Sequence, residues 1–343
     1  MLLNIFIYFE DLASMNIIAE IGSVHDGSFG NACKLIDLAA ECGANSVKFQ
    51  THISEAETLK DAPNPGYFND ESRFEYFKRT SFSLDQWKQL KSNSLKNGLN
   101  FLSSPFSISA IELLEKVPID TYKVPSGEVT NHALLENLAK IGKPVFLSSG
   151  MSTWMELDNA VNILKDNVDL TVMQCTSAYP CPYERVGINI LDQMRDRYPK
   201  PIRIGFSDHT SGISAGLIAA YQGADVIEKH LTFSRAMYGS DASNSLEPSE
   251  FKNYINLIHE ACLMRERPVD KDDLADLEEM KLVFEKSIVS SRKLKKGSLI
   301  NFKDLVFKKP GNGIKASNYK NLIGRSLTRD VPFNHQFKVE DFQ

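Results

Sequence analysis

The feature that most constrains the fold of this chain is a repeated alternation of short apolar runs with segments of helical periodicity. Such runs, separated by amphipathic segments, are typical of parallel strands joined by helical crossovers. Eight repeats predict a closed (β/α)8 barrel, the TIM barrel, rather than an open sheet. The predicted strands are Asn16–Gly22, Asn45–Gln50, Asn100–Phe106, Thr121–Gly127, Pro144–Gly150, Leu170–Ser177, Ile202–Thr210 and Val226–Thr232, and the predicted helices are Asn31–Cys42, Leu84–Asn97, Ser109–Val117, Ala133–Ile141, Met155–Lys165, Ile188–Arg197, Ile213–Tyr221 and Pro248–Met264.

The 343 residues exceed the roughly 250 that such a barrel needs. We predict the barrel over residues 15–264 and a charge-rich linker over 265–285. From Lys286 onward, short strands and turns replace the barrel pattern, which predicts a compact module over 286–343. A core of that size gives limited stability. Docking of this module on a neighbouring subunit would therefore be favourable.

Charge and cysteine content narrow the class of protein. The formal net charge of −5 provides no basic field for nucleic acid or an anionic membrane. Five scattered cysteines are too few, and odd in number, for a disulfide framework, so we expect reduced thiols in a cytoplasmic protein. The N-terminal stretch is too short to span a bilayer and is a poor signal peptide. Met15 directly precedes the first predicted strand, so residues 1–14 could be an over-extension of the true start.

Every predicted strand finishes in polar residues or is followed by one. In barrels of this type, the C-terminal strand ends and the loops after them form the active site. Polar groups there are partly buried and need partners, so chance is a poor explanation for polarity at all eight ends. The residues are Glu20, Lys48, Gln50, Ser104, Lys123, Ser126, Ser149, Tyr179, Asp208, His209, Glu228 and His230.

Two histidines end neighbouring strands, His209 in the seventh and His230 in the eighth. Adjacent strands lie roughly 4.8 Å apart, so two imidazoles at matched heights can share one divalent ion. Such a site would suit Mn²⁺, Mg²⁺, Fe²⁺ or Co²⁺ better than structural zinc. A pair of hydrogen-bonded histidines explains the spacing equally well. His25 is either a substrate contact or an exposed loop residue, and His52, His132, His259 and His335 are interpreted as structural.

Lysines and serines at the ends of the second to fourth strands indicate an anion site. Lys48, Lys123, Ser104 and Ser126 would form a phosphate cradle. An inward lysine needs an anionic partner, which could instead be Glu20 or Glu128. The carboxylates Glu20, Glu228 and Asp241 are candidates for hydroxyl binding, proton transfer or metal support. Glu228 could orient His230, or it could pair with Lys48, Lys123 or Lys229.

Together these residues resemble the N-acetylneuraminate (sialic acid) synthases and their legionaminic and pseudaminic acid relatives. The similarity is carried by motifs in family order over nearly the whole chain: Ile18–Gly22, Val47–Gln50, Ser103–Phe106, Lys123–Glu128, Ser149–Met151, Cys175–Thr176, Tyr179–Pro180, Gly205–Thr210, Glu228–His230, Ser245–Pro248, Lys309–Gly313 and Leu322–Gly324.

The resemblance implies a barrel with a C-terminal antifreeze-like (SAF) domain, exchanged in a homodimer. It implies His209 and His230 as ligands of a divalent metal, most simply Mn²⁺, with Mg²⁺ or Co²⁺ as alternatives. Phosphoenolpyruvate would bind Lys48, Gln50, Ser104, Lys123 and Ser126. An amino-sugar aldehyde would contact Glu20, Tyr179, Asp241 and Lys309, and Glu20 and Glu228 would act in catalysis, with Glu20 handling protons.

The sequence departs from the family pattern at four points, all on the sugar side. These are Val24–Gly27 in the first loop, Ser177 where asparagine is common, Ala242 where histidine is common, and Lys309 in place of an arginine. Lysine lacks the bidentate fork of arginine. The resemblance implies N-acetylmannosamine or a 2,4-diacetamido-6-deoxy hexose as the acceptor, and the four departures bear on which sugar it is rather than on the type of reaction. Alternatives are a keto-deoxy sugar acid synthase that uses an unacetylated aldose, or a non-catalytic sugar-binding homologue.

Overall fold

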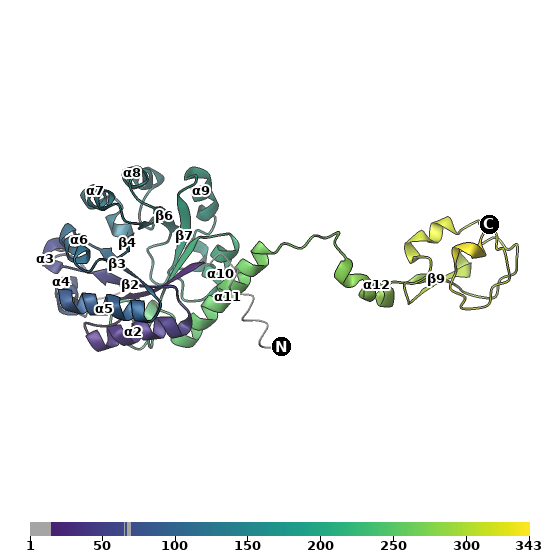
Figure 1. Cartoon of the computed structure of the whole chain (residues 1–343), viewed down its shortest axis with the longest axis horizontal. Helices are drawn as coiled ribbons and strands as arrows, with labels where there is room; N and C mark the ends of the chain where they lie inside the picture. The colour runs from purple at the N-terminus through teal and green to yellow at the C-terminus, as the bar shows by residue number, and fades with distance from the viewer. Residues whose placement is uncertain (1–14, 65, 67–69) are drawn as a thin grey trace. The chain divides into compact units, whose positions relative to one another are not determined.

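The structure is a computed structural model that describes residues 15–64, 66 and 70–343 (Figure 1). The expectation about residues 1–14 lies outside the described residues. The chain forms two compact units, one ending at Arg267 and the other comprising Pro268–Gln343. This boundary falls just beyond the barrel end at residue 264 that the sequence suggested, because the last barrel helix continues to Glu266.

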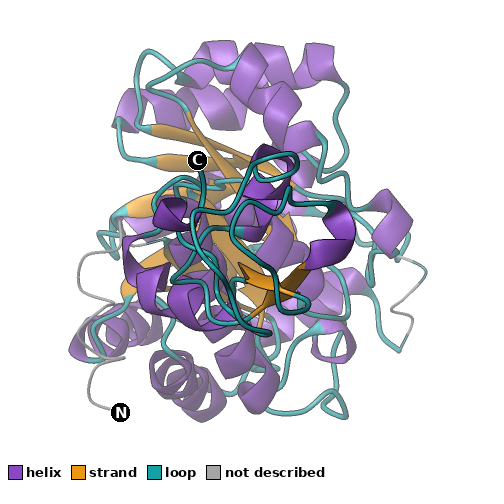
Figure 2. Cartoon of the chain, turned by 90° about the vertical axis from the view of Figure 1, so that its right-hand side faces the viewer, coloured by secondary structure: helices purple, strands orange, loops and turns teal. Residues whose placement is uncertain are grey.

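The first unit contains a closed barrel of eight parallel strands, as predicted. The first strand pairs with both the second and the eighth, which closes the sheet. Figure 2 shows strands surrounded by helices in this unit. The strands are β1 (Asn16–Gly22), β2 (Ser46–Thr51), β3 (Asn100–Pro105), β4 (Thr121–Val124), β5 (Val145–Ser148), β6 (Leu170–Gln174), β7 (Arg203–Asp208) and β8 (Val226–His230).

Helices follow the strands and pack their apolar faces on the outside of the barrel. Side-chain caps define several of their starts: Ser28 caps α2, and Ser83 with Gln86 and Thr153 with Glu156 form capping boxes. The short α3 and α4 have no counterpart among the predicted helices. The helices are α2 (Phe29–Cys42), α3 (Ser54–Glu57), α4 (Arg73–Thr80), α5 (Leu84–Lys96), α6 (Ile108–Glu115), α7 (His132–Ile141), α8 (Trp154–Leu164), α9 (Ile190–Arg197), α10 (Ser214–Tyr221) and α11 (Pro248–Glu266).

Several strands end earlier than predicted. β4 stops at Val124, and Ser126–Glu128 forms a 3-10 helix. β6 stops at Gln174, so Tyr179 lies in the loop after it. Polar residues such as Ser126 and Tyr179 therefore lie in turns or loops and not in the sheet. Sequence periodicity cannot tell the last residues of a strand from the first residues of the turn after it.

A small apolar cluster fills the interior of the barrel. Successive side chains of a strand point to opposite faces, so residues two apart share a face. Each member of the cluster lies two positions before a polar residue near the C-terminal end of its strand or in the loop beyond it. The cluster is Ile18, Leu102, Phe146, Met173 and Val226, and the polar partners are Glu20, Ser104, Ser148, Cys175 and Glu228. The alternation places an apolar floor beneath a polar cavity.

The second unit has its own apolar core. Its two-stranded antiparallel sheet pairs β9 (Ser287–Ser290) with β10 (Leu305–Lys308). Isolated bridges and 3-10 turns complete the fold around buried residues such as Ile288, Leu327 and Phe337. The segment predicted as a linker contains α12 (Glu278–Phe284).

The five cysteines all lie within the described residues and are free thiols. Among the helices of the described chain, none combines the length and the apolar character needed to cross a bilayer.

Candidate active site

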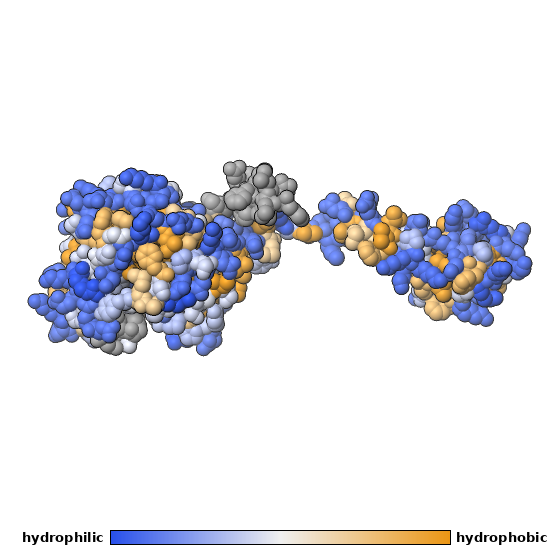
Figure 3. Space-filling view, turned by 90° about the horizontal axis from the view of Figure 1, so that it is seen from below, coloured by the Kyte–Doolittle hydropathy of each residue, from blue (hydrophilic) through white to orange (hydrophobic). Residues whose placement is uncertain are grey.

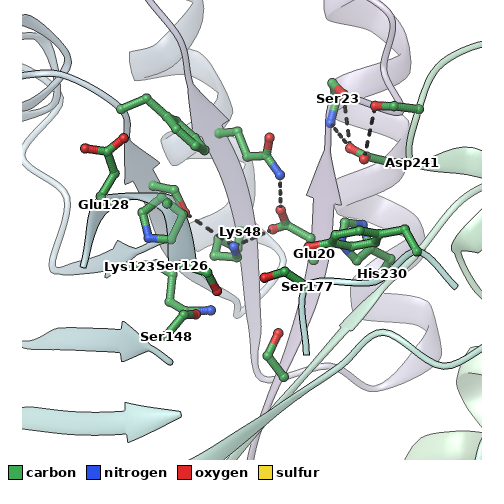
Figure 4. Close-up of a pocket in the computed structure, with 18 of the residues that line it drawn as sticks. Glu20, Ser23, Lys48, Lys123, Ser126, Glu128, Ser148, Ser177, His230 and Asp241 are labelled. Carbon is green, nitrogen blue, oxygen red and sulfur yellow. Dashed lines mark hydrogen bonds and ion pairs between the residues drawn. The ribbon is translucent and has the colours of Figure 1, made fainter. Parts of the chain in front are cut away.

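A cavity of about 590 Å³ opens at the C-terminal ends of the barrel strands (Figure 4). It brings together all but one of the residues predicted for the site. Those that line it are Glu20, Lys48, Gln50, Ser104, Lys123, Ser126, Tyr179, His209, Glu228, His230 and Asp241. The exception, Lys309, belongs to the second unit, where its ammonium lies 4.6 Å from the centre of the Phe284 ring. Its predicted contact with the sugar stays a prediction.

Two lysines and two glutamates form a buried ion-pair cluster in the cavity, which we call the lysine group: Glu20, Lys48, Lys123 and Glu228. Lys123 Nζ donates to both carboxylate oxygens of Glu228 at 2.9 Å. Lys48 Nζ lies 3.2 Å from Glu20 Oε2 and 3.4 Å from Glu228 Oε1. All four side chains are at most 6% exposed. The alternative of internal ion pairs therefore holds, although the partner of Lys123 is Glu228 and not Glu20 or Glu128.

Mutual charge compensation shifts the pKa values in this cluster. Burial alone would raise the pKa of Glu228, but the Lys123 and Lys48 ammonium groups hold it well below its usual range. Burial alone would lower the pKa of Lys48, but Glu20 and Glu228 raise it. Glu228 is thus a carboxylate that neutralises two cations, and among the described residues its ion pairs are with Lys123 and Lys48. Ser207 Oγ also donates a hydrogen bond to Glu228 Oε1 at 3.0 Å.

Serines surround the lysine group. Lys48 Nζ donates to Ser104 Oγ at 3.3 Å. Ser126 Oγ accepts from the Gly150 amide at 3.1 Å and lies 3.1 Å from Cys175 Sγ. A β carbon at Gly150 would overlap the side chains of Ser126, Cys175 and Ser177, so only glycine fits this turn. Ser149 was predicted as the polar end of the fifth strand, but it points to a separate hollow, and Ser148 faces the cavity.

The two predicted metal ligands, which we call the histidine group, lie side by side. The ring centroids of His209 and His230 are 6.0 Å apart. His209 Nδ1 lies 2.8 Å from the Thr176 carbonyl, so this nitrogen carries the hydrogen and Nε2 keeps its lone pair. Burial, with a smaller effect of His230, lowers the pKa of His209 to about 3, which keeps the ring neutral. Tyr179 lies at the same place, with its hydroxyl 3.4 Å from His209 Nε2.

This arrangement fits a divalent metal held by two protein nitrogens. A neutral imidazole with a fixed tautomer is the form that binds metals. His230 Nδ1 is buried and makes no hydrogen bond within the described part of the chain. Within the same residues, no cluster of three or more His, Cys, Asp or Glu side chains is arranged as a metal site. The remaining ligands would have to be oxygens of water or substrate.

Asp241 is fixed beside the histidine group by the first barrel loop. Its Oδ2 accepts from the amide and the hydroxyl of Ser23, each at 3.0 Å. Gly22 adopts φ +54°, and a β carbon there would overlap the Asp241 carboxylate. Burial alone would raise the pKa of Asp241, but His230 and the Ser23 donors lower it. An ionised carboxylate is thus available for hydroxyl or metal-bound groups. His25, predicted as a loop residue, is buried and not exposed.

Asp208 and Lys229, the neighbours of the two histidines, point to the other face of the barrel wall. Asp208 Oδ1 lies 3.1 Å from Lys229 Nζ, and Tyr254 of α11 donates to Asp208 Oδ2. The two side chains are fully buried and are paired across β7 and β8. Asp208 is therefore a structural residue and not part of the cavity.

The sequence interpretation missed several cavity residues: His52, Arg73, Phe77, Phe106 and Ser148. Ser148 could have been found from the period of two, because it lies on the same strand face as Phe146. His52 was interpreted as structural because no partner was visible near it in sequence. Arg73 and Phe77 lie on α4, a helix that was not predicted. For those two, the sequence carried no signal.

Comparison with known proteins decides the family. The NeuB family model matches residues 35–269. This chain belongs to the NeuB family. It is 34% identical to an N,N'-diacetyllegionaminic acid synthase from Campylobacter jejuni over 92% of this chain and 96% of that protein. It is 32% identical to the human N-acetylneuraminate-9-phosphate synthase over 91% and 88%.

A solved structure agrees. The N-acetylneuraminic acid synthetase of Leptospira borgpetersenii, crystallised with citrate, superposes with a TM-score of 0.68 at 29% identity. The match covers 78% of this chain and 90% of that one. The NeuB-family chain is therefore a synthase-type transferase of nonulosonic acid formation, and its barrel is the TIM barrel of these enzymes. The non-catalytic alternative is not supported.

Proposed function

We propose that the chain condenses phosphoenolpyruvate with an N-acetylated amino-sugar aldehyde and releases a sialic-acid-type nonulosonic acid and phosphate. The observation that carries this proposal is the meeting of the lysine group and the histidine group in one cavity. Two ammonium groups suit a doubly charged enol phosphate, and imidazole nitrogens suit a metal that binds an aldehyde oxygen.

The phosphate end would use Lys48, Lys123, Ser104 and Ser126, with Gln50 beside them. In the described structure the lysines neutralise Glu20 and Glu228, so a bound anion would share these cations with the carboxylates. The serine hydroxyls can rotate to donate to phosphate oxygens. Fixed cations next to the leaving phosphate stabilise the charge that develops as the C–O bond breaks.

The bond-forming steps follow from this placement. C3 of phosphoenolpyruvate attacks the aldehyde carbon, and the aldehyde oxygen gains a proton. Positive charge then develops at C2, which Glu228 and Glu20 stabilise. Water adds at C2 and loses one proton, which balances the proton gained by the aldehyde oxygen. The new hydroxyl then gives its remaining proton to the departing phosphate as the C2–O bond breaks and a ketone is left. Glu20 handles protons in this proposal, because it is a buried carboxylate that faces the cavity beside Lys48 and Gln50.

A divalent metal, in our proposal Mn²⁺, would be held by His209 and His230 and would polarise the aldehyde as a Lewis acid. Tyr179 and Asp241 are placed to bind sugar hydroxyls next to these histidines. Asp241 accepts hydrogen bonds, and the Tyr179 hydroxyl can donate or accept. Ser177 also lines the cavity, and it is shorter than the asparagine common in related enzymes.

A panel of hexoses and acetamido hexoses with phosphoenolpyruvate and Mn²⁺ tests the proposal. We expect phosphate release only with acetamido sugars, and mass spectrometry should identify a product that has gained three carbons. Turnover restricted to unacetylated aldoses would instead establish the keto-deoxy sugar acid synthase. Absence of phosphate release with every sugar would contradict the use of phosphoenolpyruvate.

We also propose that the second unit is an SAF domain that completes the site of a second subunit in a homodimer, with Lys309 reaching the sugar. In support, residues of α12 and its flanks expose large apolar side chains (Figure 3), including Val269, Met280, Val283 and Phe284. A chain that ends at Glu285 should bind phosphoenolpyruvate but turn over poorly. Full activity of that shortened chain would overturn the exchange of domains.

A further inference from the structure

A pair of side chains that the proposed reaction does not use directly lies against the cavity wall. His52 follows β2, and Glu57 ends α3. Their side chains are 7% and 3% exposed, and His52 Nδ1 lies 2.7 Å from Glu57 Oε1. The second Glu57 oxygen accepts from the Ile53 amide at 3.3 Å. The Glu57 carboxylate is therefore held by a backbone amide just before α3, and its other oxygen fixes the His52 imidazole.

Two aromatic rings restrict His52 further. The ring stacks on Phe77 at a centroid distance of 3.6 Å and a tilt of 14°, and on Phe106 at 4.0 Å and 20°. Phe77 belongs to α4 and Phe106 follows β3, so two other segments of the chain hold the imidazole between them. Such a ring can neither swing nor flip without displacing both neighbours.

The second ring nitrogen faces Gln50, a residue of the predicted phosphoenolpyruvate site. His52 Nε2 lies 3.2 Å from Gln50 Oε1, and Gln50 Nε2 donates to Glu20 Oε1 at 2.7 Å. The four residues thus form one chain of hydrogen bonds: Glu57, His52, Gln50 and Glu20. Glu20 Oε2 then meets Lys48 at 3.2 Å.

The direction of this chain follows from its two ends. Glu57 accepts, so His52 Nδ1 donates. Glu20 also accepts, so the Gln50 NH₂ faces Glu20 and the Gln50 oxygen faces His52 Nε2. The flipped amide would turn its oxygen toward a carboxylate oxygen, which is repulsive. In this orientation the Gln50 oxygen lies 3.2 Å from His52 Nε2 while its NH₂ donates to Glu20, so His52 and Glu57 are linked to Glu20 through Gln50.

We propose that His52 and Glu57 are positioning residues that orient Gln50 and, through it, hold the Glu20 carboxylate in place for the reaction. The size of the kinetic effect rests on the proposed function, but the orientation of Gln50 does not. The inference predicts that loss of the His52 donors lowers kcat while the phosphate end of the cavity stays intact.

His52→Phe is the informative variant, because it keeps an aromatic ring between Phe77 and Phe106 and removes both donors. We expect kcat to fall by about 10- to 100-fold, as for a small displacement of a reacting group. The Kd for phosphoenolpyruvate, measured by calorimetry without sugar, should change less than kcat does, because Lys48 and Lys123 are unaltered and Gln50 alone among the predicted phosphoenolpyruvate contacts is displaced. His52→Gln, which retains a donor near the Nε2 position, should recover part of kcat. His132→Phe, the same exchange at an exposed histidine of α7, is the control.

A double-mutant cycle with Gln50→Leu separates positioning from general damage. If His52 acts through Gln50, the double variant His52→Phe/Gln50→Leu should be no slower than Gln50→Leu alone. Additive losses, or an unchanged kcat in His52→Phe, would overturn the inference. So would an equal loss in His52→Gln and His52→Phe.

A crystal structure of His52→Phe gives a readout that needs no turnover. The Gln50 amide should move out of hydrogen-bonding distance of Glu20, with the Phe77 and Phe106 rings in place. An unchanged Gln50–Glu20 hydrogen bond would overturn the inference even in an active enzyme. If the wild-type protein releases no phosphate with any sugar, the proposed function fails, and this structural result still decides the role of His52.

Discussion

The lysine group and the histidine group share one cavity, but their buried groups are balanced in different ways. In the lysine group each ammonium contacts at least one carboxylate, and Lys123 Nζ contacts both oxygens of Glu228 at 2.9 Å. In the histidine group, no ion pair of the described residues includes His209 or His230. His209 is neutral because its pKa is lowered to about 3 chiefly by burial, and His230 Nδ1 is left without a hydrogen bond in that part of the chain.

Because only the lysine group contains ion pairs within the described structure, we expect the two groups to contribute differently to stability and to ligand binding. Charges that compensate one another hold the barrel mouth together before any ligand arrives, and a buried pair that loses one partner leaves an uncompensated charge. The imidazoles of the histidine group form no ion pair among the described residues, so they add little to stability, but their nitrogens offer ligands to a metal. Changes in the lysine group should therefore damage fold and activity together, whereas changes in the histidine group should damage activity alone.

The largest effect is expected for Lys123→Met. This change leaves Glu228 with the Ser207 hydrogen bond and the longer ion pair to Lys48, so the free energy of unfolding should fall by about 3–5 kcal/mol. Turnover should also be lost, because the phosphate end loses a cation. Urea denaturation and phosphate release measure the two effects.

The double variant Lys123→Met/Glu228→Gln is the matched control. It removes the pair together, so most of the lost stability should return while turnover stays absent. A single variant as stable as the wild type would show that the ion pair contributes nothing to the fold. The proposed difference between the lysine group and the histidine group in their contribution to stability would then be wrong.

A second prediction concerns His209→Gln and His230→Gln. Turnover should fall by about 10³-fold or more, which corresponds to roughly 4 kcal/mol of transition-state stabilisation. The free energy of unfolding should change by no more than about 1 kcal/mol, because no charge pair is broken. Calorimetric titration with Mn²⁺ should show weaker binding in both variants. Turnover without added metal in either variant would contradict the metal assignment.

Much of the fold followed from the sequence because a barrel strand needs only a short apolar run, and eight such runs were visible. Glu20, Lys48, Lys123, Glu228 and His230 could also be placed, since a period of two on a known strand puts residues on the cavity face. Which of them pair with one another could not be predicted. That depends on strand register, such as the alignment of Glu20 with both Lys48 and His230.

The residues that sequence reasoning missed share a physical cause. His52 and Phe106 follow their strands, and Phe77 lies on a helix of eight residues, so none of them belongs to a repeating pattern. Their stacking depends on how α4 and the segments after β2 and β3 pack together. That packing is set by the tertiary structure and leaves no pattern in the sequence. Ser149 was misplaced for a simpler reason: the fifth strand ends at Ser148, and one residue of error exchanges the two faces.

The smallest predicted effect tests whether the burial that keeps His209 neutral also keeps His25 neutral. His25 packs against Phe82 at a centroid distance of 4.6 Å, and its Nδ1 accepts from the Gly27 amide at 3.1 Å. Burial lowers its pKa from 6.5 to about 4, with His52 acting in the same direction and Asp241 and the Gly22 backbone opposing it. The folded chain thus binds this proton less readily than the unfolded chain, so the stability is present above pH 6.5 and is lost as the pH falls toward 4.

His25→Asn keeps an acceptor for the Gly27 amide but has no group that titrates. The stability advantage of the wild type over this variant should therefore shrink by up to about 3 kcal/mol between pH 7 and pH 4. Denaturation curves at several pH values measure it, with His132→Asn as the control for an exposed histidine. A difference that stays constant over this range would mean that His25 is solvated or already charged. The neutral state of His209 would then have no counterpart at His25.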